Sequence, residues 1–266
     1  MCDTKKSWFS RATPILVAFI LAIVALFGFI VLKQLMENGL RAVATGIIPD
    51  YDNSLYHDIA ASAAMVIVVL VFRCWGRVGL NWPKSRKGYG ALAIFVCYIA
   101  TINLADGFSF AHLTFHLVFF ELLTEGLTGF WEELCFRGFL MKILQPCGIL
   151  GSLLISSALF GILHVGSANA QFGRFLLLAT FGLMMAVNRL QTNSILPAIV
   201  AHGTSNAFNG IFSVPSSVPD GGESVNQKWI MVGVSVPVPI YRFLTIRKNL
   251  TAWSDRRCET NIRTGT

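Results

Sequence analysis

The sequence predicts an all-α protein, a polytopic bundle of transmembrane helices with one amphipathic helix at the membrane interface. Of its 266 residues, 54% are apolar and only 13% are charged, and the mean hydropathy is +0.62. A helix needs about 20 mostly apolar residues to cross a bilayer. Such stretches predict about eight spans, which leave little chain for a soluble domain, so that residues 1–266 form a single membrane domain. The spans are expected at 14–32, 59–72, 89–105, 127–145, 148–164, 173–189, 194–212 and 228–246.

The first span, 14–32, is longer than the apolar region of a signal peptide, which is typically about 7–15 residues, so we expect it to be retained. Basic residues precede this span and follow the second and the last spans. Because cytoplasmic loops concentrate lysine and arginine, both termini are predicted to be cytoplasmic. The acidic segment 33–58 and the loop 213–227 then lie on the opposite side.

The formal charge of +7 agrees with this topology and with attraction to anionic lipid. No basic patch is interleaved with aromatic residues, so the chain is expected to bind no nucleic acid, and its surroundings are the lipid bilayer. The six cysteines lack C-x-x-C or metal-ribbon spacing, which indicates free thiols. Short loops and compact size favour a multi-pass protein of a prokaryotic cell membrane.

Segment 107–126 carries polar side chains among aromatic ones at helical spacing, which predicts an interfacial helix before the fourth span. We expect this helix to end at Gly126, with Gly129 as a break. Its polar residues are His112, His116, Glu121 and Glu125. We interpret them as a polar interfacial face, because the histidines lack the glutamate of an H-E-x-x-H metal motif.

Two adjacent carboxylates, Glu132 and Glu133, lie inside the fourth span, where an ionisable side chain costs several kcal/mol and usually has a function. They point about 100° apart on a helix, so we assign them separate roles. Glu133 can pair with Arg137 four residues later. Glu132 has no such partner, and a desolvated, unpaired carboxylate is a candidate general base.

Two later spans supply complementary groups. In the fifth span Phe160 precedes His164 by one turn, and in the seventh span His202 and Asn206 share one helix face. Hydrolysis requires a base, an electrophile or metal, and donors for a developing oxyanion. With Glu132, these residues supply those types from three helices. Small residues on both spans allow the close helix approach that would bring them together.

These motifs, E-E-x-x-x-R, then F-x-x-x-H, then H-x-x-x-N, resemble those of the CAAX protease and bacteriocin-processing (CPBP, or Abi) family of intramembrane metalloproteases. Its eukaryotic members include the Ras-converting prenyl endopeptidase. The resemblance covers residues 107–212, the expected catalytic core. It implies an endopeptidase that hydrolyses a peptide bond near or within the membrane, with a peptide or membrane-protein substrate, which in this family is often prenylated.

The resemblance also implies residue roles. Glu132 would activate water with His164, while His202 and Asn206 would bind metal or stabilise the oxyanion. Glu133, Arg137 and Phe160 would support them. The expected cofactor is Zn²⁺, with His164 and His202 as ligands, since neutral imidazoles and an open position suit zinc. With the amino terminus inside, the fourth span runs inward and puts Glu132 near the outer face; otherwise segment 107–126 crosses the membrane and the orientation reverses.

Other interpretations stay open on the residues alone. A protein of this fold could act without catalysis, as a bacteriocin-immunity factor or an envelope regulator. Glu132, Glu133 and Arg137 could form an ion network that only fixes helix packing. A transporter could use the carboxylates as a proton relay, although the halves of the chain do not repeat. A thiol mechanism at Cys135 lacks an attending histidine on its helix.

Overall fold

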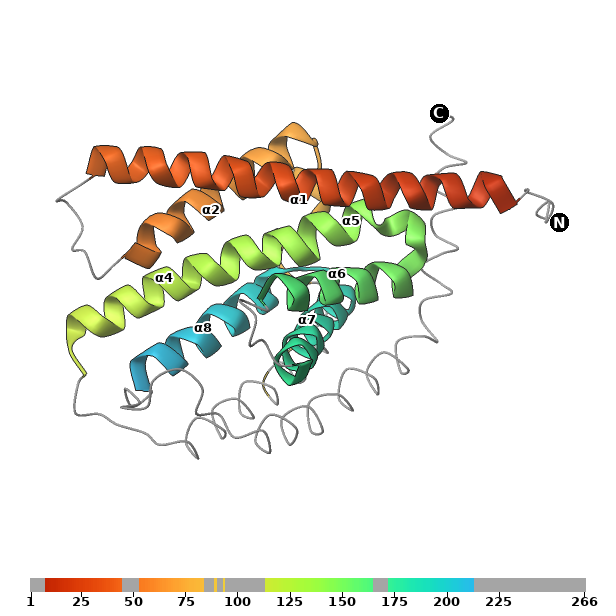
Figure 1. The fold of residues 1–266 in the computed structure, drawn as a ribbon. Helices are drawn as coiled ribbons and strands as arrows, with labels where there is room; N and C mark the ends of the chain where they lie inside the picture. Colours follow the sequence, from red (N-terminus) through yellow and green to blue (C-terminus); the bar gives the residue numbers. More distant parts are fainter. Residues whose placement is uncertain are drawn as a thin grey trace.

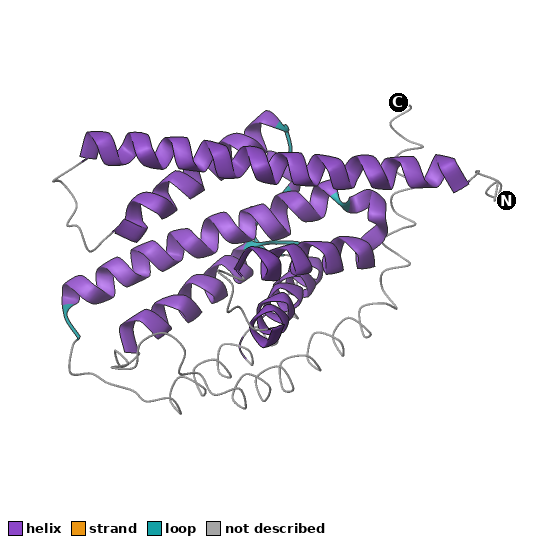
Figure 2. Ribbon diagram, viewed as in Figure 1, coloured by secondary structure: helices purple, strands orange, loops and turns teal. Residues whose placement is uncertain are grey.

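The computed structural model describes residues 8–44, 53–83, 89, 93, 113–164 and 172–212, and all regular structure in them is helical (Figure 2). Four helices in this part are long and apolar enough to cross a membrane. They are Thr13–Ala44, Ser54–Val71, Gln145–His164 and Arg174–Thr192. The predicted all-α membrane protein is therefore confirmed. The count of about eight spans is not, and the expected spans 89–105 and 228–246 lie almost wholly outside the described residues.

The helices follow one another as Figure 1 shows, from α1 at the amino terminus to α8. Short 3₁₀ turns (η2, η4) and one π-helix (η3) join the longer α-helices. The elements are α1 Trp8–Ala44, α2 Asn53–Val71, η2 Trp75–Arg77, α4 Phe115–Glu133, η3 Leu134–Leu140, α5 Met141–Ile143, η4 Gln145–Cys147, α6 Gly148–His164, α7 Phe172–Thr192 and α8 Leu196–Phe212.

Helix α1 extends well beyond the predicted span 14–32, so the expected connection 33–58 is wrong over most of its length. The helix continues because charged residues four apart pair along it: Arg41 Nη2 lies 2.8 Å from Glu37 Oε1. Its last residue, Ala44, accepts a hydrogen bond from the Tyr56 hydroxyl at 2.9 Å. The end of α1 therefore lies beside the start of α2.

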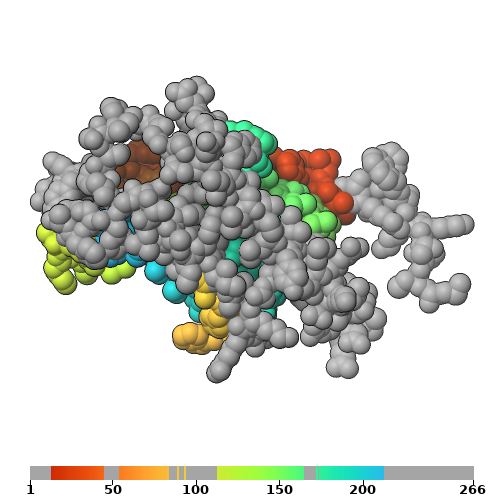
Figure 3. All heavy atoms as spheres, turned by 90° about the horizontal axis from the view of Figure 1, so that it is seen from below, coloured from red at the N-terminus to blue at the C-terminus, as the bar shows by residue number. Residues whose placement is uncertain are grey.

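Helix α4 is continuous from Phe115 to Glu133, so the predicted break at Gly126 and Gly129 is wrong. The glycines serve helix packing instead. A Cβ on Gly129 would lie 2.8 Å from the backbone nitrogen of Gly203 on α8, and one on Gly203 would lie 2.9 Å from the Glu125 carbonyl oxygen. Side chains at either position would push the helices apart. Helices α4 and α8 consequently lie side by side, and their residues reach the surface together at one end of the molecule (Figure 3).

The π-helix η3 directly follows the two glutamates and carries seven buried residues, Arg137 among them. π-Helical turns are rare and are frequent at functional sites. Buried aromatic residues on both sides, Phe136 and Phe139, hold the segment in the core. The segment continues through α5 and η4 into α6, which packs along α7. This path places the end of α6 against the end of α4.

Candidate active site

Glu132 lies in the last turn of α4 with 4% of its surface exposed. Two histidines from other helices face its carboxylate. His164 Nε2, at the end of α6, is 3.2 Å from Glu132 Oε1, and His202 Nε2, on α8, is 3.6 Å from Oε2. The structure thus brings together the carboxylate and both histidines selected from the sequence.

His164 is oriented by its own helix. Its Nδ1 lies 2.8 Å from the carbonyl oxygen of Phe160, which can only accept a hydrogen bond, so Nδ1 carries a proton. The Nε2 atom therefore faces Glu132 Oε1. Since an ionised carboxylate also only accepts, these two atoms can share a proton. The Glu132–His164 pair is consequently built to hold and release one proton.

His202 contacts both glutamates. Its Nδ1 donates a hydrogen bond to Glu133 Oε1 at 3.0 Å, while its Nε2 faces Glu132. The imidazole is almost fully buried, with a side chain 5% exposed. The two carboxylates therefore have different partners, as predicted, but one imidazole links them. No sequence pattern indicates this link, because it depends on how α8 packs against α4.

The predicted pair of Glu133 and Arg137 forms, with Arg137 Nη1 3.2 Å from Glu133 Oε1 and both side chains fully buried. The two groups form an ion pair but not a hydrogen bond. In the described part of the chain no guanidinium nitrogen of Arg137 makes a hydrogen bond. The guanidinium also lies over the Phe160 ring, 4.4 Å from its centroid. Such cation–π contacts contribute about 2 kcal/mol when desolvated.

Phe160 is the centre of the aromatic packing round the site. Its ring lies 4.3 Å from that of His164 and 6.0 Å from that of His202, measured between centroids. Phe181 on α7 packs edge-on against His202 at 4.8 Å. These rings restrict both imidazoles and exclude water on one side. Phe160 therefore packs against both imidazoles, and its supporting role in catalysis stays a prediction.

Asn206 does not contact Glu132 directly; its side chain is hydrogen-bonded to Glu125. Glu125 was expected to lie on the polar face of an interfacial helix. It belongs instead to α4, on the same helix face as Glu132. Glu125 interacts electrostatically with His202 and with Glu132. A spacing of seven residues, two helical turns, between Glu125 and Glu132 was the signal that could have identified it.

Asp58 is a second acidic residue near the site that the sequence did not single out. It lies buried on α2, accepts a hydrogen bond from Trp131 Nε1 at 3.2 Å, and also bonds Thr128. Trp131 immediately precedes Glu132. Asp58 therefore anchors the site-bearing turn of α4 to α2. Asp58 ends the acidic segment 33–58, whose charges the sequence analysis assigned to topology and not to the site.

The residues fit a metal only in part. In the described ranges no group of three or more His, Cys, Asp or Glu side chains is arranged to hold an ion. However, Nδ1 of each histidine is engaged by an oxygen atom, which leaves both Nε2 atoms turned toward one carboxylate. Metal-ligating histidines commonly show this engagement of the second nitrogen. His112 lies outside the described residues.

Residues 114–208 match the family model described as Type II CAAX prenyl endopeptidase Rce1-like. This segment, about a third of the chain, is similar to the CAAX prenyl endopeptidases that the model describes. The match confirms the resemblance predicted from the three motifs, and it contains Glu125, Glu132, His164, His202 and Asn206. A search of curated proteins finds no match to the chain. This similarity and the four apolar helices of the described residues together support a membrane-bound protease.

Proposed function

We propose that the chain is an intramembrane endopeptidase of the CAAX type in which Glu132 activates the attacking water. The observation that carries this proposal is a buried carboxylate that faces two histidines from other helices, with Oε2 making no hydrogen bond among the described residues. A buried acceptor without a partner costs about 1–3 kcal/mol. A bound water would satisfy it, and this water is the nucleophile of the proposed reaction.

The proposed reaction can be described by the proton transfers that it requires. Glu132 accepts a proton from the water, and the hydroxide oxygen attacks the carbonyl carbon of the scissile peptide bond. The negative charge that develops on the carbonyl oxygen is stabilised by donors from α8. Glu132 then gives the proton that it took from the water to the departing amine, while His164 holds the carboxylate in place. The bond between carbon and nitrogen breaks, and the site returns to its starting protonation.

Asn206 is the proposed donor to the oxyanion, and His202 either shares this role or holds a metal ion through Nε2. The amide nitrogen of Asn206 carries two hydrogens, and Glu125 is the partner of this side chain in the structure. The second hydrogen of the Asn206 amide can be donated to the oxyanion while the hydrogen bond between Asn206 and Glu125 is kept. Removing one oxyanion donor typically lowers kcat by about 10²–10³-fold. We expect Asn206→Ala to lower kcat by that factor with little change in KM.

We further propose Zn²⁺ as a cofactor, with Nε2 of His164 and His202 as ligands. When bound, zinc supplies a water whose pKa is lowered to about 7. The protein's own contribution is to hold both imidazoles through Phe160 and Glu133. Metal analysis of the purified protein is expected to find one zinc ion per chain, lost in His202→Ala. Zinc-free protein with full activity would contradict the cofactor but not the role of Glu132.

The proposed substrate is a membrane-associated peptide or protein, including one with a prenylated carboxyl terminus. We also propose a prokaryotic cell membrane with both termini cytoplasmic. The test incubates the purified chain in micelles with prenylated and unprenylated forms of one CAAX peptide and with a leader peptide. Mass spectrometry should detect a released carboxyl-terminal fragment, absent with Glu132→Ala. A folded chain that cleaves no substrate would favour a non-enzymatic immunity factor or envelope regulator.

A further inference from the structure

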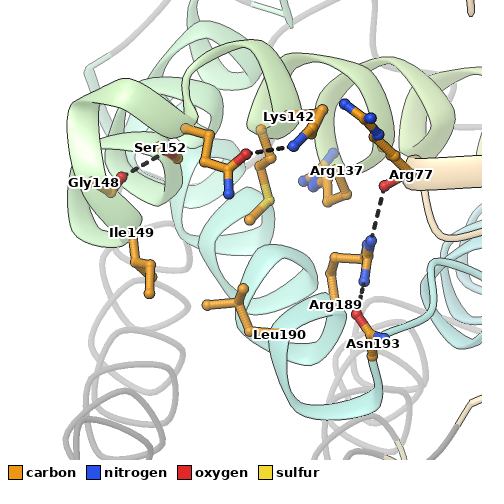
Figure 4. Close-up of a pocket in the computed structure, with 12 residues that line it drawn as sticks. Arg77, Arg137, Lys142, Gly148, Ile149, Ser152, Arg189, Leu190 and Asn193 are labelled. Atoms are coloured by element: carbon orange, nitrogen blue, oxygen red, sulfur yellow. Dashed lines mark hydrogen bonds between the residues drawn. The ribbon is translucent and has the colours of Figure 1, made fainter. Parts of the chain in front are cut away.

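A second polar region lies at the opposite end of α6 from His164. It is a cavity of about 180 Å³ between η2, η3, α5, α6 and α7 (Figure 4). Four cationic side chains line it: Arg77, Arg137, Lys142 and Arg189. Apolar side chains, Ile149 and Leu190, lie at the other end of the same cavity. No carboxylate is present in its described lining.

Two cations of this cavity, Arg137 and Arg189, have buried donors without a partner among the described residues. Within these residues Arg189 donates to neutral acceptors, the Asn193 side chain at 3.1 Å and the Arg77 carbonyl oxygen at 3.4 Å. Its buried Nε makes no hydrogen bond within the described residues. Arg137 is 1% exposed, and Glu133 is the anion that faces it, on the side of the candidate active site. Lys142 donates to Gln145.

The backbone makes room for the Arg189 guanidinium. A Cβ on Gly79 would lie 2.5 Å from Arg189 Cζ, and Gly79 has a φ of +90°, which other residues rarely adopt. The chain after η2 therefore wraps closely round this side chain. A flexible surface arginine needs no such cradle. The guanidinium is held in place beside the cavity before any ligand arrives.

The ends of three candidate spans meet at the cavity, where the headgroups of a bilayer would lie. Three candidate spans have an end there: Ser54–Val71 ends shortly before Arg77, Gln145–His164 begins at its rim, and Arg174–Thr192 ends beside it. Trp75 and Trp82 in the adjoining segment are 45% and 84% exposed. Exposed tryptophans gather where a membrane meets water. An anion reaches this depth either from lipid or from the aqueous phase.

We propose that this cavity binds a phosphate group. The planar donor fork of arginine matches phosphate oxygens, and charge-assisted hydrogen bonds to it are strong. The bound oxygens would satisfy the open donors of Arg137 and Arg189 and offset the accumulated charge. The same chemistry is offered by the headgroup of an anionic phospholipid and by a free phosphate ion. Ile149 and Leu190 would contact the carbon atoms of a lipid.

The test uses the full-length chain purified in neutral detergent. Native mass spectrometry measures retention of phosphatidylglycerol against phosphatidylcholine, and thermal unfolding is followed with and without inorganic phosphate. The variants are Arg189→Gln and Lys142→Gln, with Arg189→Lys to restore the charge if the glutamine variant fails to fold. Arg73→Gln is the matched control. It also removes one positive charge, and Arg73 follows the end of α2 near the cavity but is not part of the cavity lining.

We expect the wild type to prefer phosphatidylglycerol, and each cavity variant to lose at least about tenfold in affinity, as for a buried hydrogen bond to a charged group. Arg73→Gln should stay within about twofold, since an exposed charge contributes little. Stabilisation by inorganic phosphate alone, lost in the same variants, would assign the site to a soluble anion. Equal retention of both lipids with no effect of phosphate, or equal losses in Arg73→Gln, would overturn the proposal.

Discussion

Two buried clusters in this molecule each contain a glutamate and a histidine from another helix, yet their glutamates are satisfied differently. In the carboxylate of Glu37 on α1, Oε1 lies 2.8 Å from Arg41 Nη2, and Oε2 lies 3.7 Å from Lys33 Nζ and 3.3 Å from His57 Nδ1. The ion-pair partners of Glu132 on α4 among the described residues are two imidazoles, at 3.2 and 3.6 Å. Two permanent cations hold the first carboxylate ionised. The second can exchange a proton with its neighbours, which is what general base catalysis requires.

The difference also concerns helix geometry. The cations beside Glu37 lie four residues away on its own helix, so these two ion pairs could form in α1 alone, without His57 of α2. The partners of Glu132 come from α6 and α8, and the packing of three helices is needed to assemble them. A local ion network stabilises a helix. A cluster assembled from three helices is positioned only when the fold is complete, and such positioning is typical of catalytic sites.

The largest effect that separates the clusters is expected from the histidines. His164→Ala and His202→Ala should each lower kcat/KM for peptide cleavage by about 10²–10⁴-fold, the contribution of a positioned acid or base. His57→Ala, the control from the other cluster, should leave kcat/KM within about threefold, because His57 is partly exposed and lies in the cluster that has no proposed catalytic role. Cleavage assays of the three purified variants measure this. A His57→Ala loss equal to the others would remove the distinction.

The next effect concerns stability. Arg137→Gln leaves Glu133 buried without its cation, and breaking a buried pair in this way costs about 3–5 kcal/mol in the free energy of unfolding. Arg41→Gln is the matched change, and there Lys33 still faces Glu37. It should cost no more than about 1 kcal/mol. Unfolding by denaturant in mixed micelles compares the two variants; similar midpoints would contradict the different burial of the pairs.

A smaller effect is expected at the contact that holds the site together. Gly129→Ala places a Cβ against the Gly203 backbone, and overpacking of this kind costs about 1–3 kcal/mol. Activity should fall with stability, because His202 moves with α8. Gly126→Ala, one turn away, meets nothing within 4 Å, and alanine there should stabilise the helix by about 0.5–1 kcal/mol. Equal losses in both variants would contradict the close approach of α4 and α8.

Much of this site could be predicted from the sequence. Charges inside apolar stretches are costly, which drew attention to Glu132 and Glu133, and four-residue spacing identified the partner Arg137. The histidines followed because hydrolysis needs their chemistry. The Asn206–Glu125 bond was missed because Glu125 was assigned to a separate helix. That error arose at Gly126 and Gly129, where glycine was interpreted as a helix break although it permits contact with a helix about seventy residues away.

Other features depend on tertiary structure that no local pattern encodes. The π-helix after Glu133 is fixed by packing on both sides. The length of α1 was underestimated, because the charged residues beyond the apolar span were taken as a connection, whereas they pair within the helix and with His57 of α2. The contact of His202 with both glutamates likewise requires knowledge of the register of α8 against α4.

The most direct test compares Glu132→Gln with Glu37→Gln. Both replace a buried carboxylate by an amide of the same shape, so folding and insertion are preserved to a similar degree. Cleavage of a CAAX peptide by each purified variant should fall by at least about 10²-fold for Glu132→Gln, the loss expected of a general base, and remain near the wild-type rate for Glu37→Gln. Full activity in Glu132→Gln would contradict the assignment of Glu132 as the base.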